Sequence, residues 1–198
     1  MNMNKQKTNE SVQEAGALLA RLSHGDLMIL GARPGQGKTQ MSLKLAVEAM
    51  KSGRRGVFFT LEYSAADVMN LFKSIGEDPA DFQDMFEFDV SDAISAEYII
   101  KRLSNVPAGT VVIIDYLQLL DQKRENPELM VQVQALKSFA LERGLTMVFI
   151  SQIDRSFDAS SGVFPSLSEV RLPNPLDMKL FNKACFLNNG QLQFSAIS

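Results

Sequence analysis

Residues 32 to 39 read Ala32-Arg33-Pro34-Gly35-Gln36-Gly37-Lys38-Thr39, the most specific signal in this 198-residue chain. An apolar run, Leu27 to Leu30, precedes the stretch, and Lys38 to Lys51 follows it with apolar residues at helical spacing. A glycine-rich turn between a buried strand and a helix is the context that a phosphate-binding P-loop requires. The stretch therefore predicts a nucleoside triphosphate site, with ATP and Mg²⁺ as the expected ligands.

Each residue type in the stretch has a physical role in binding phosphate. Gly35 and Gly37 let backbone N–H groups turn toward phosphate oxygens, and the helix that starts at Lys38 adds its positive N-terminal dipole. We expect Lys38 to reach the β- and γ-phosphates and the Thr39 hydroxyl to ligate Mg²⁺. Nucleotide contacts are assigned to Ala32, Arg33, Pro34, Gly35, Gln36, Gly37, Lys38, Thr39 and Gln40.

The stretch departs from the usual motif at its first position. A P-loop normally begins with glycine, whereas this chain has Ala32 there and Gly31 one residue earlier. An ordinary strand–turn–helix junction is the alternative interpretation. The loop spacing, the lysine and the threonine together favour the P-loop.

A second apolar run ends in a carboxylate. Val111 to Ile114 is a run of four β-branched residues, typical of a central parallel strand, and Asp115 follows it. With a P-loop upstream, this pattern predicts a Walker B aspartate that supports Mg²⁺. Taken alone the signal is weak, because any buried strand can end in an aspartate at a turn.

Glu62 and Gln152 also follow predicted strands. Glu62 comes after Val57 to Leu61, and Gln152 comes after Thr146 to Ser151. Side chains at the carboxyl edge of a parallel sheet face the ligand crevice, so Glu62 could activate the attacking water and Gln152 could sense the γ-phosphate. A polar residue that merely ends a strand is an equally good interpretation of each from spacing alone.

Apolar runs alternate with segments of helical periodicity along the whole chain. This alternation predicts an α/β fold with a mostly parallel central sheet flanked by helices. Two short strands around Asn188-Asn189-Gly190 predict a C-terminal β-hairpin. We expect residues 1–14 to be a flexible polar tail and residues 15–198 to be one domain.

The composition limits the partners. A formal net charge of −3 means that the protein surface as a whole is not positively charged, so any binding of nucleic acid would depend on a local patch of basic residues. Lys123, Arg124 and Arg155 follow strands at the active edge and are the candidates for such contacts, although solvated surface charges are the better interpretation from residues alone.

The cysteine content and the apolar segments indicate where the protein is located. The single Cys185 fits a reducing cytoplasm. The polar N-terminus lacks a signal sequence, and no apolar run reaches the ~18 residues of a membrane span.

Four segments together resemble a known family. GARPGQGKT (31–39), FFTLEYS (58–64), VVIIDYLQLL (111–120) and VFISQIDRS (148–156) occur in the order and spacing of the RecA-like ATPase domain of DnaB-type replicative helicases. The resemblance covers roughly residues 22–187. Its most specific part is Asp115-Tyr116-Leu117-Gln118-Leu119, which a generic P-loop protein has no reason to carry.

The resemblance implies roles that spacing left open. It identifies Glu62 as the catalytic glutamate, Gln152 as the phosphate-sensing glutamine and Arg155 as the arginine that follows. It also implies that residues 121–126 and 157–167 project into a central channel and grip single-stranded DNA. The implied active form is a homo-oligomeric ring such as a hexamer.

The departures from the family favour a second hypothesis. The family has a primase-interacting domain before its ATPase domain and, after the segment that matches residues 181–189, a basic hairpin that carries its arginine finger. We expect this chain to have neither. An arginine finger can be worth ~10³–10⁵ in rate, so hydrolysis should be slow if nothing replaces it. The alternative is therefore a nucleotide-dependent binding or assembly module with little turnover and no unwinding. A small-molecule kinase is a third hypothesis, disfavoured by the absence of an arginine-rich lid.

Overall fold

The computed structural model describes residues 14–121, 123–172 and 174–197. The flexible tail predicted for residues 1–14 lies outside the described residues except for Glu14, which is the first residue of a short helix over 14–19. This helix ends at residue 19 because Arg21 and Leu22 donate their N–H groups three residues back, to Leu18 and Leu19, which tightens the last turn.

Seven strands form one sheet among the described residues, in the order β3-β2-β4-β5-β1-β6-β7. All neighbouring pairs are parallel except β6 and β7, which form an antiparallel hairpin. The strands are β1 (Leu27–Ala32), β2 (Gly56–Thr60), β3 (Phe86–Asp89), β4 (Val111–Asp115), β5 (Thr146–Gln152), β6 (Lys183–Asn188) and β7 (Gln191–Ala196). The predicted fold class and its C-terminal hairpin are confirmed.

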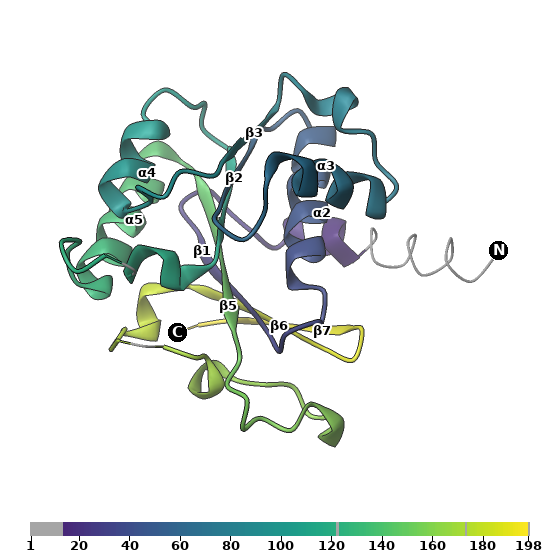
Figure 1. The fold of residues 1–198 in the computed structure, drawn as a ribbon, viewed down its shortest axis with the longest axis vertical. Helices are drawn as coiled ribbons and strands as arrows, with labels where there is room; N and C mark the ends of the chain where they lie inside the picture. Colours follow the sequence, from purple (N-terminus) through teal and green to yellow (C-terminus); the bar gives the residue numbers. More distant parts are fainter. Residues whose placement is uncertain (1–13, 122, 173, 198) are drawn as a thin grey trace.

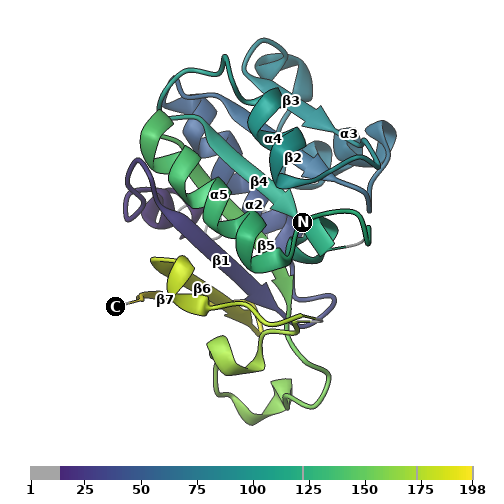
Figure 2. The same cartoon turned by 90° about the vertical axis from the view of Figure 1, so that its left-hand side faces the viewer.

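Helices cover both faces of the sheet (Figure 1, Figure 2). The helices are α2 (Lys38–Lys51), α3 (Ala65–Ser74), α4 (Ala96–Arg102) and α5 (Leu129–Arg143). Alternate residues of β4 enter different cores: Val112 and Ile114 pack in the cluster that contains α5, and Ile113 packs in the cluster that contains α2. Burial on both faces explains why the central strands are apolar without interruption.

Local signals place the helix starts well. Ser64, the N-cap of α3, accepts from the Asp67 N–H, and the Asp67 side chain accepts from the Ser64 N–H, which completes a capping box. Helix α5 begins at Leu129, two residues after Pro127. The strand expected over Thr146 to Ser151 also includes Gln152, because Ser151 and Gln152 pair with Gly31 and Ala32 of β1.

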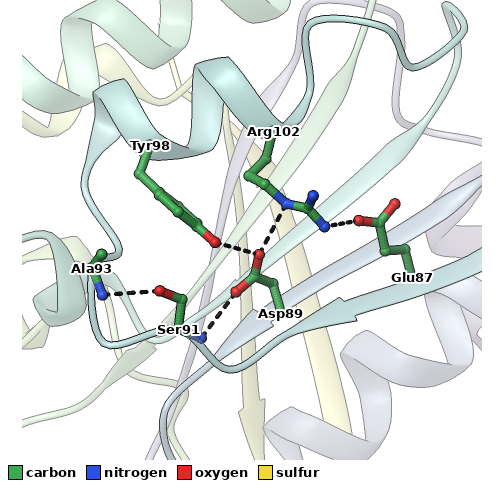
Figure 3. Close-up of polar contacts among 6 residues, drawn as sticks. All are labelled: Glu87, Asp89, Ser91, Ala93, Tyr98 and Arg102. Atoms are coloured by element: carbon green, nitrogen blue, oxygen red, sulfur yellow. Dashed lines mark hydrogen bonds and ion pairs between the residues drawn. The ribbon is translucent and has the colours of Figure 1, made fainter.

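A polar network joins edge strand β3 to α4 (Figure 3). One oxygen of the buried Asp89 carboxylate accepts from the Tyr98 hydroxyl at 2.8 Å and from Arg102 Nε at 3.0 Å. Its other oxygen accepts from the Ser91 N–H at 2.9 Å, and Arg102 also pairs with Glu87. These partners of Asp89 all lie at this edge of the sheet, so the network stabilises the fold rather than shaping the P-loop.

No helix among the described residues combines the length and the apolar character needed to cross a membrane.

Candidate functional site

The P-loop connects β1 to α2 and has the backbone shape that phosphate binding needs. Gly35 and Gly37 have φ of +79° and +83°, a region that favours glycine, and no atom lies within 4 Å of a Cβ built on either residue. Gly37 is the N-cap of α2, and no side chain caps the helix and no acidic residue lies in its first turn. The first N–H groups of α2 are therefore available to an anion.

The shifted glycine has a packing role. A Cβ on Gly31 would lie 2.7 Å from Cε1 of Phe186, closer than real Cβ atoms come, and it would also lie tightly, at 3.1 Å, against Cδ1 of Ile153. Gly31 therefore lets β6 approach β1. Ala32, the residue at the motif's usual glycine position, is buried and ends β1, with Gln152 as its register partner on β5.

The sheet topology gathers the other predicted residues at the same edge. β5 lies between β1 and β4, so Gln152 at its end stands between the P-loop strand and the strand of Asp115. Asp115 ends β4 and pairs in register with Thr60 of β2. Glu62 follows two residues after Thr60, and its N–H donates to the Thr60 hydroxyl at 3.1 Å. The carboxyl ends of β1, β5, β4 and β2 thus lie at the edge of the sheet where α2 begins.

Asp115 is the electrostatic centre of this edge. Its side chain is fully buried, and the Thr39 hydroxyl donates to its Oδ2 at 3.4 Å. Burial, followed by the charge of Glu62, raises the pKa of Asp115 to about 7, while Lys38 and the Thr39 hydrogen bond act in the opposite direction. Its Oδ1 is buried and has no hydrogen-bond partner among the described residues. A partnerless oxygen on a destabilised carboxylate marks a place for a cation.

The residues at this edge could hold a Mg²⁺ ion that is also coordinated by the phosphates of a bound nucleotide. Thr39 and Asp115 offer two hard oxygen ligands at one point. The described part of the chain contains no cluster of three or more His, Cys, Asp or Glu side chains suited to a metal. A cation here would thus take its remaining ligands from phosphate oxygens and water, which is how protein sites usually bind Mg²⁺.

Four further residues, Tyr63, Tyr116, Gln118 and Arg171, border the site without having been assigned a role. The Tyr63 hydroxyl donates to Thr39 Oγ1 at 3.5 Å. Gln118 donates through Nε2 to the backbone carbonyl of Arg171, and its own Oε1 is buried without a partner in the described part of the chain. Tyr116, Gln118, Gln152 and Arg171 line a pocket of about 220 Å³. Tyr116 and Gln118 belong to the family-like motif after Asp115, but strand spacing gives no signal for their contacts.

The nucleic-acid candidates lie on two different segments of the chain, one after β4 and one after β5. Lys123 and Arg124 line a cavity of about 500 Å³ together with Asn174 and Pro175. Arg155 is exposed in the segment after β5 and is not among the residues that line this cavity. Neither group of residues contacts the P-loop through a described hydrogen bond. Their assignment to DNA stays a prediction.

The fold and this edge define the chain as an α/β protein of the RecA-like P-loop ATPase class. A family model described as "ATPase: KaiC" matches residues 17–169, and the chain therefore belongs to the KaiC family of ATPases. Among solved structures, a KaiC-like protein of Pyrococcus horikoshii is similar with a TM-score of 0.61 and 19% identity, covering 82% of this chain and 70% of that one. A DnaB-like replicative helicase, described with its interactions with primase, gives a TM-score of 0.66 and 15% identity over 88% of this chain and 56% of that one.

Curated relatives have replicative helicase names. A probable plasmid replicative DNA helicase of Chlamydia trachomatis is 26% identical, covering 82% of this chain and 42% of the relative. The replicative DNA helicase DnaB of Helicobacter pylori strain J99 is 25% identical, covering 75% of this chain and 37% of the relative. The chain thus spans about two fifths of the length of these relatives. The resemblance to DnaB-type ATPase domains is confirmed.

Proposed function

We propose that the chain binds MgATP at the P-loop and hydrolyses it, and that single-stranded DNA is its partner. The observation that carries the proposal is the buried Asp115 carboxylate, which keeps one oxygen without a described partner beside the Thr39 hydroxyl at the N-terminus of α2. Membership of an ATPase family supports the same interpretation.

Each residue of the edge has a separate task in this proposal. The N–H groups of Gly35 and Gly37 and the Lys38 ammonium bind the phosphates, and Thr39 and Asp115 hold the cation. Mg²⁺ held by these two residues would supply positive charge that stabilises the negative charge of the phosphate chain during hydrolysis. Glu62, exposed at the carboxyl end of β2, orients the attacking water and accepts its proton. Gln152 contacts the γ-phosphate and responds to its loss.

The DNA part of the proposal rests on the relatives and on three cations. The curated relatives are named as replicative DNA helicases, and Lys123, Arg124 and Arg155 lie on the segments that follow β4 and β5. A grip made of such residues would be electrostatic, and its affinity would fall steeply as salt is raised. A ring of identical subunits is the assembly that we propose for the active form.

An ATPase assay with and without single-stranded DNA tests the proposal. We expect turnover by the wild type to rise on adding DNA, and we expect the rise to shrink with salt. Joint replacement of Lys123 and Arg124 by alanine should weaken DNA binding without changing turnover in the absence of DNA. The matched control replaces the exposed Lys73 and Lys101, which lie on α3 and α4. A rate that stays flat across added DNA contradicts the DNA part of the proposal.

A nucleotide-dependent binding or assembly module is the second candidate. The net charge of −3 favours it, as does the small number of candidate DNA contacts, since Arg155 does not line the cavity of Lys123 and Arg124. It predicts tight ATP binding, negligible turnover with or without DNA, and ATP-dependent association measured by light scattering.

A further inference from the structure

The turn of the β6–β7 hairpin has an unusual backbone. Asn189 has φ of +51° and Gly190 has φ of +76°, which is typical of the two central residues of a type I′ turn. Asn189 is the one non-glycine residue with positive φ in the described part of the chain. The side chain at this position is therefore held in a fixed direction by a tight two-residue turn.

This turn contacts the P-loop on one side and the segment after β5 on the other. The backbone N–H of Asn189 donates to Gln36 Oε1 at 2.8 Å. Its side-chain Nδ2 donates to the carbonyl oxygen of Ala159 at 2.9 Å. The neighbouring Asn188, which is 4% exposed, donates through Nδ2 to the carbonyl oxygen of Val163 at 2.8 Å. The hairpin turn therefore binds two carbonyl groups of the 157–164 segment.

The 157–164 segment belongs to a longer excursion that is closed at its base. The Asp154 N–H donates to the carbonyl of Glu169 at 2.8 Å, and the Arg171 N–H donates to the carbonyl of Gln152 at 2.8 Å. Arg33 of the P-loop donates through Nη1 to the carbonyl of Asp154 at 3.0 Å. The P-loop thus holds the excursion directly at its first residue, and through Asn189 in its middle.

We propose that Asn189 is a positioning residue that couples nucleotide on the P-loop to the order of the 157–164 segment. The inference rests on the proposed nucleotide binding. Gln36 lies between the two glycines whose N–H groups would bind phosphate, so phosphate binding fixes the Gln36 backbone and with it the direction of its amide. A fixed Gln36 amide holds the Asn189 turn, and the held turn keeps the Ala159 and Val163 carbonyls bonded.

Hydrogen exchange of the segment, measured with and without nucleotide, tests the coupling. The probe is an ATP analogue with a non-hydrolysable β,γ-linkage, at saturation with MgCl₂. In the wild type we expect the amides of residues 157–164 to exchange about fivefold more slowly when nucleotide is bound, the value of roughly one hydrogen bond. A separate titration of each protein with the same analogue gives the dissociation constant, so nucleotide binding is checked independently of the coupling.

Asn189→Gly is the informative variant. Glycine accepts the positive φ and keeps the N–H that reaches Gln36, so the change removes only the link to Ala159. We expect the nucleotide-dependent protection of residues 157–164 to vanish while the dissociation constant stays within about twofold. Gln36→Ala, which cuts the other link, should also abolish the protection at saturating nucleotide. Gln191→Ala, an exposed amide in the same hairpin, is the matched control and should keep it.

A purely structural role makes a different prediction. It would speed exchange of residues 157–164 equally with and without nucleotide, and the ratio between the two states would then be unchanged in Asn189→Gly. That outcome overturns the inference, as does a wild type that binds the analogue without protecting the segment. A wild type that fails to bind the analogue overturns the proposed function and this inference with it.

Discussion

The Thr39 hydroxyl and the Asp115 carboxylate meet 3.4 Å apart, where the first turn of α2 comes against the end of β4. The contact satisfies one carboxylate oxygen and leaves the other buried without a partner among the described residues. This arrangement is costly for the protein without ligands, because the charged form of the carboxylate is buried with Glu62 nearby.

The cost of this buried charge should appear as a pH dependence of stability. The pKa of Asp115 is raised from 3.8 to about 7 in the folded protein, so the native state holds a proton that the unfolded chain has lost. The stabilisation from the protonated carboxyl is complete below about pH 4 and is lost as pH rises to about 7. In Asp115→Asn, which stays neutral, this loss should be absent.

Thermal unfolding in EDTA, without nucleotide, checks the prediction. The melting temperature of Asp115→Asn minus that of the wild type should increase from about pH 4 to about pH 7 and level off above. Asp92→Asn, which removes an exposed carboxylate after β3, is the control and should give a flat difference. A flat difference for Asp115→Asn as well would contradict the assigned burial penalty.

Lys38→Ala and Glu62→Gln should separate nucleotide binding from turnover. Lys38→Ala removes the cation that faces the phosphates, so we expect binding to weaken by about tenfold or more and turnover to be lost. Glu62→Gln preserves shape while removing the proposed base, so binding should persist and turnover should fall about 100-fold or more. Titration with a fluorescent nucleotide and phosphate release measure the two quantities. Full turnover by Glu62→Gln would refute its assignment as the base.

Gly31→Ala should destabilise the sheet next to the P-loop. The new Cβ would lie 2.7 Å from the Phe186 ring, so β6 must move away from β1, at a cost of about 1–3 kcal/mol in the free energy of unfolding. Gly16→Ala is the control, because its Cβ would meet nothing closer than 3.6 Å and its helix should gain up to about 1 kcal/mol. Adding Phe186→Leu should recover part of the loss, as urea unfolding would show.

Asp89→Ala should destabilise the edge strand without affecting the nucleotide. The change leaves the Tyr98 hydroxyl and the Arg102 guanidinium without their acceptor, which should cost about 1–3 kcal/mol. Thermal unfolding measures the loss, and nucleotide titration should give an unchanged dissociation constant. A weakened affinity in Asp89→Ala would mean that the network reaches the P-loop.

Local sequence patterns predicted most of the fold because they depend on neighbouring residues. The β-branched run before Asp115 and the capping residues around Ser64 act within a few residues, so the strand and the helix start could be placed directly. Gly31 is different. A glycine is needed at position 31 because the Phe186 ring packs against it, and Phe186 is far along the chain, so sequence spacing does not indicate this contact.

The residues of the candidate site likewise fall into those that a local motif predicts and those that depend on contacts between distant segments. Lys38, Thr39 and Asp115 could be assigned because their motifs link residue type to a local strand or helix end. The contacts of Tyr63 and Gln118 depend on how the loops pack above the sheet, which no periodicity encodes. The link from Gln36 through Asn189 to Ala159 joins three separate loops and is visible only in the folded chain.

The positions of the tyrosines allow nucleotide binding to be followed by the intrinsic fluorescence of the protein. The chain contains no tryptophan and three tyrosines. One of them, Tyr63, touches Thr39, and another, Tyr116, lines the pocket beside Gln152. Near-ultraviolet emission of the unlabelled chain therefore comes largely from rings at the nucleotide edge. Occupancy of that edge should change the emission directly, so binding can be followed without attaching a dye.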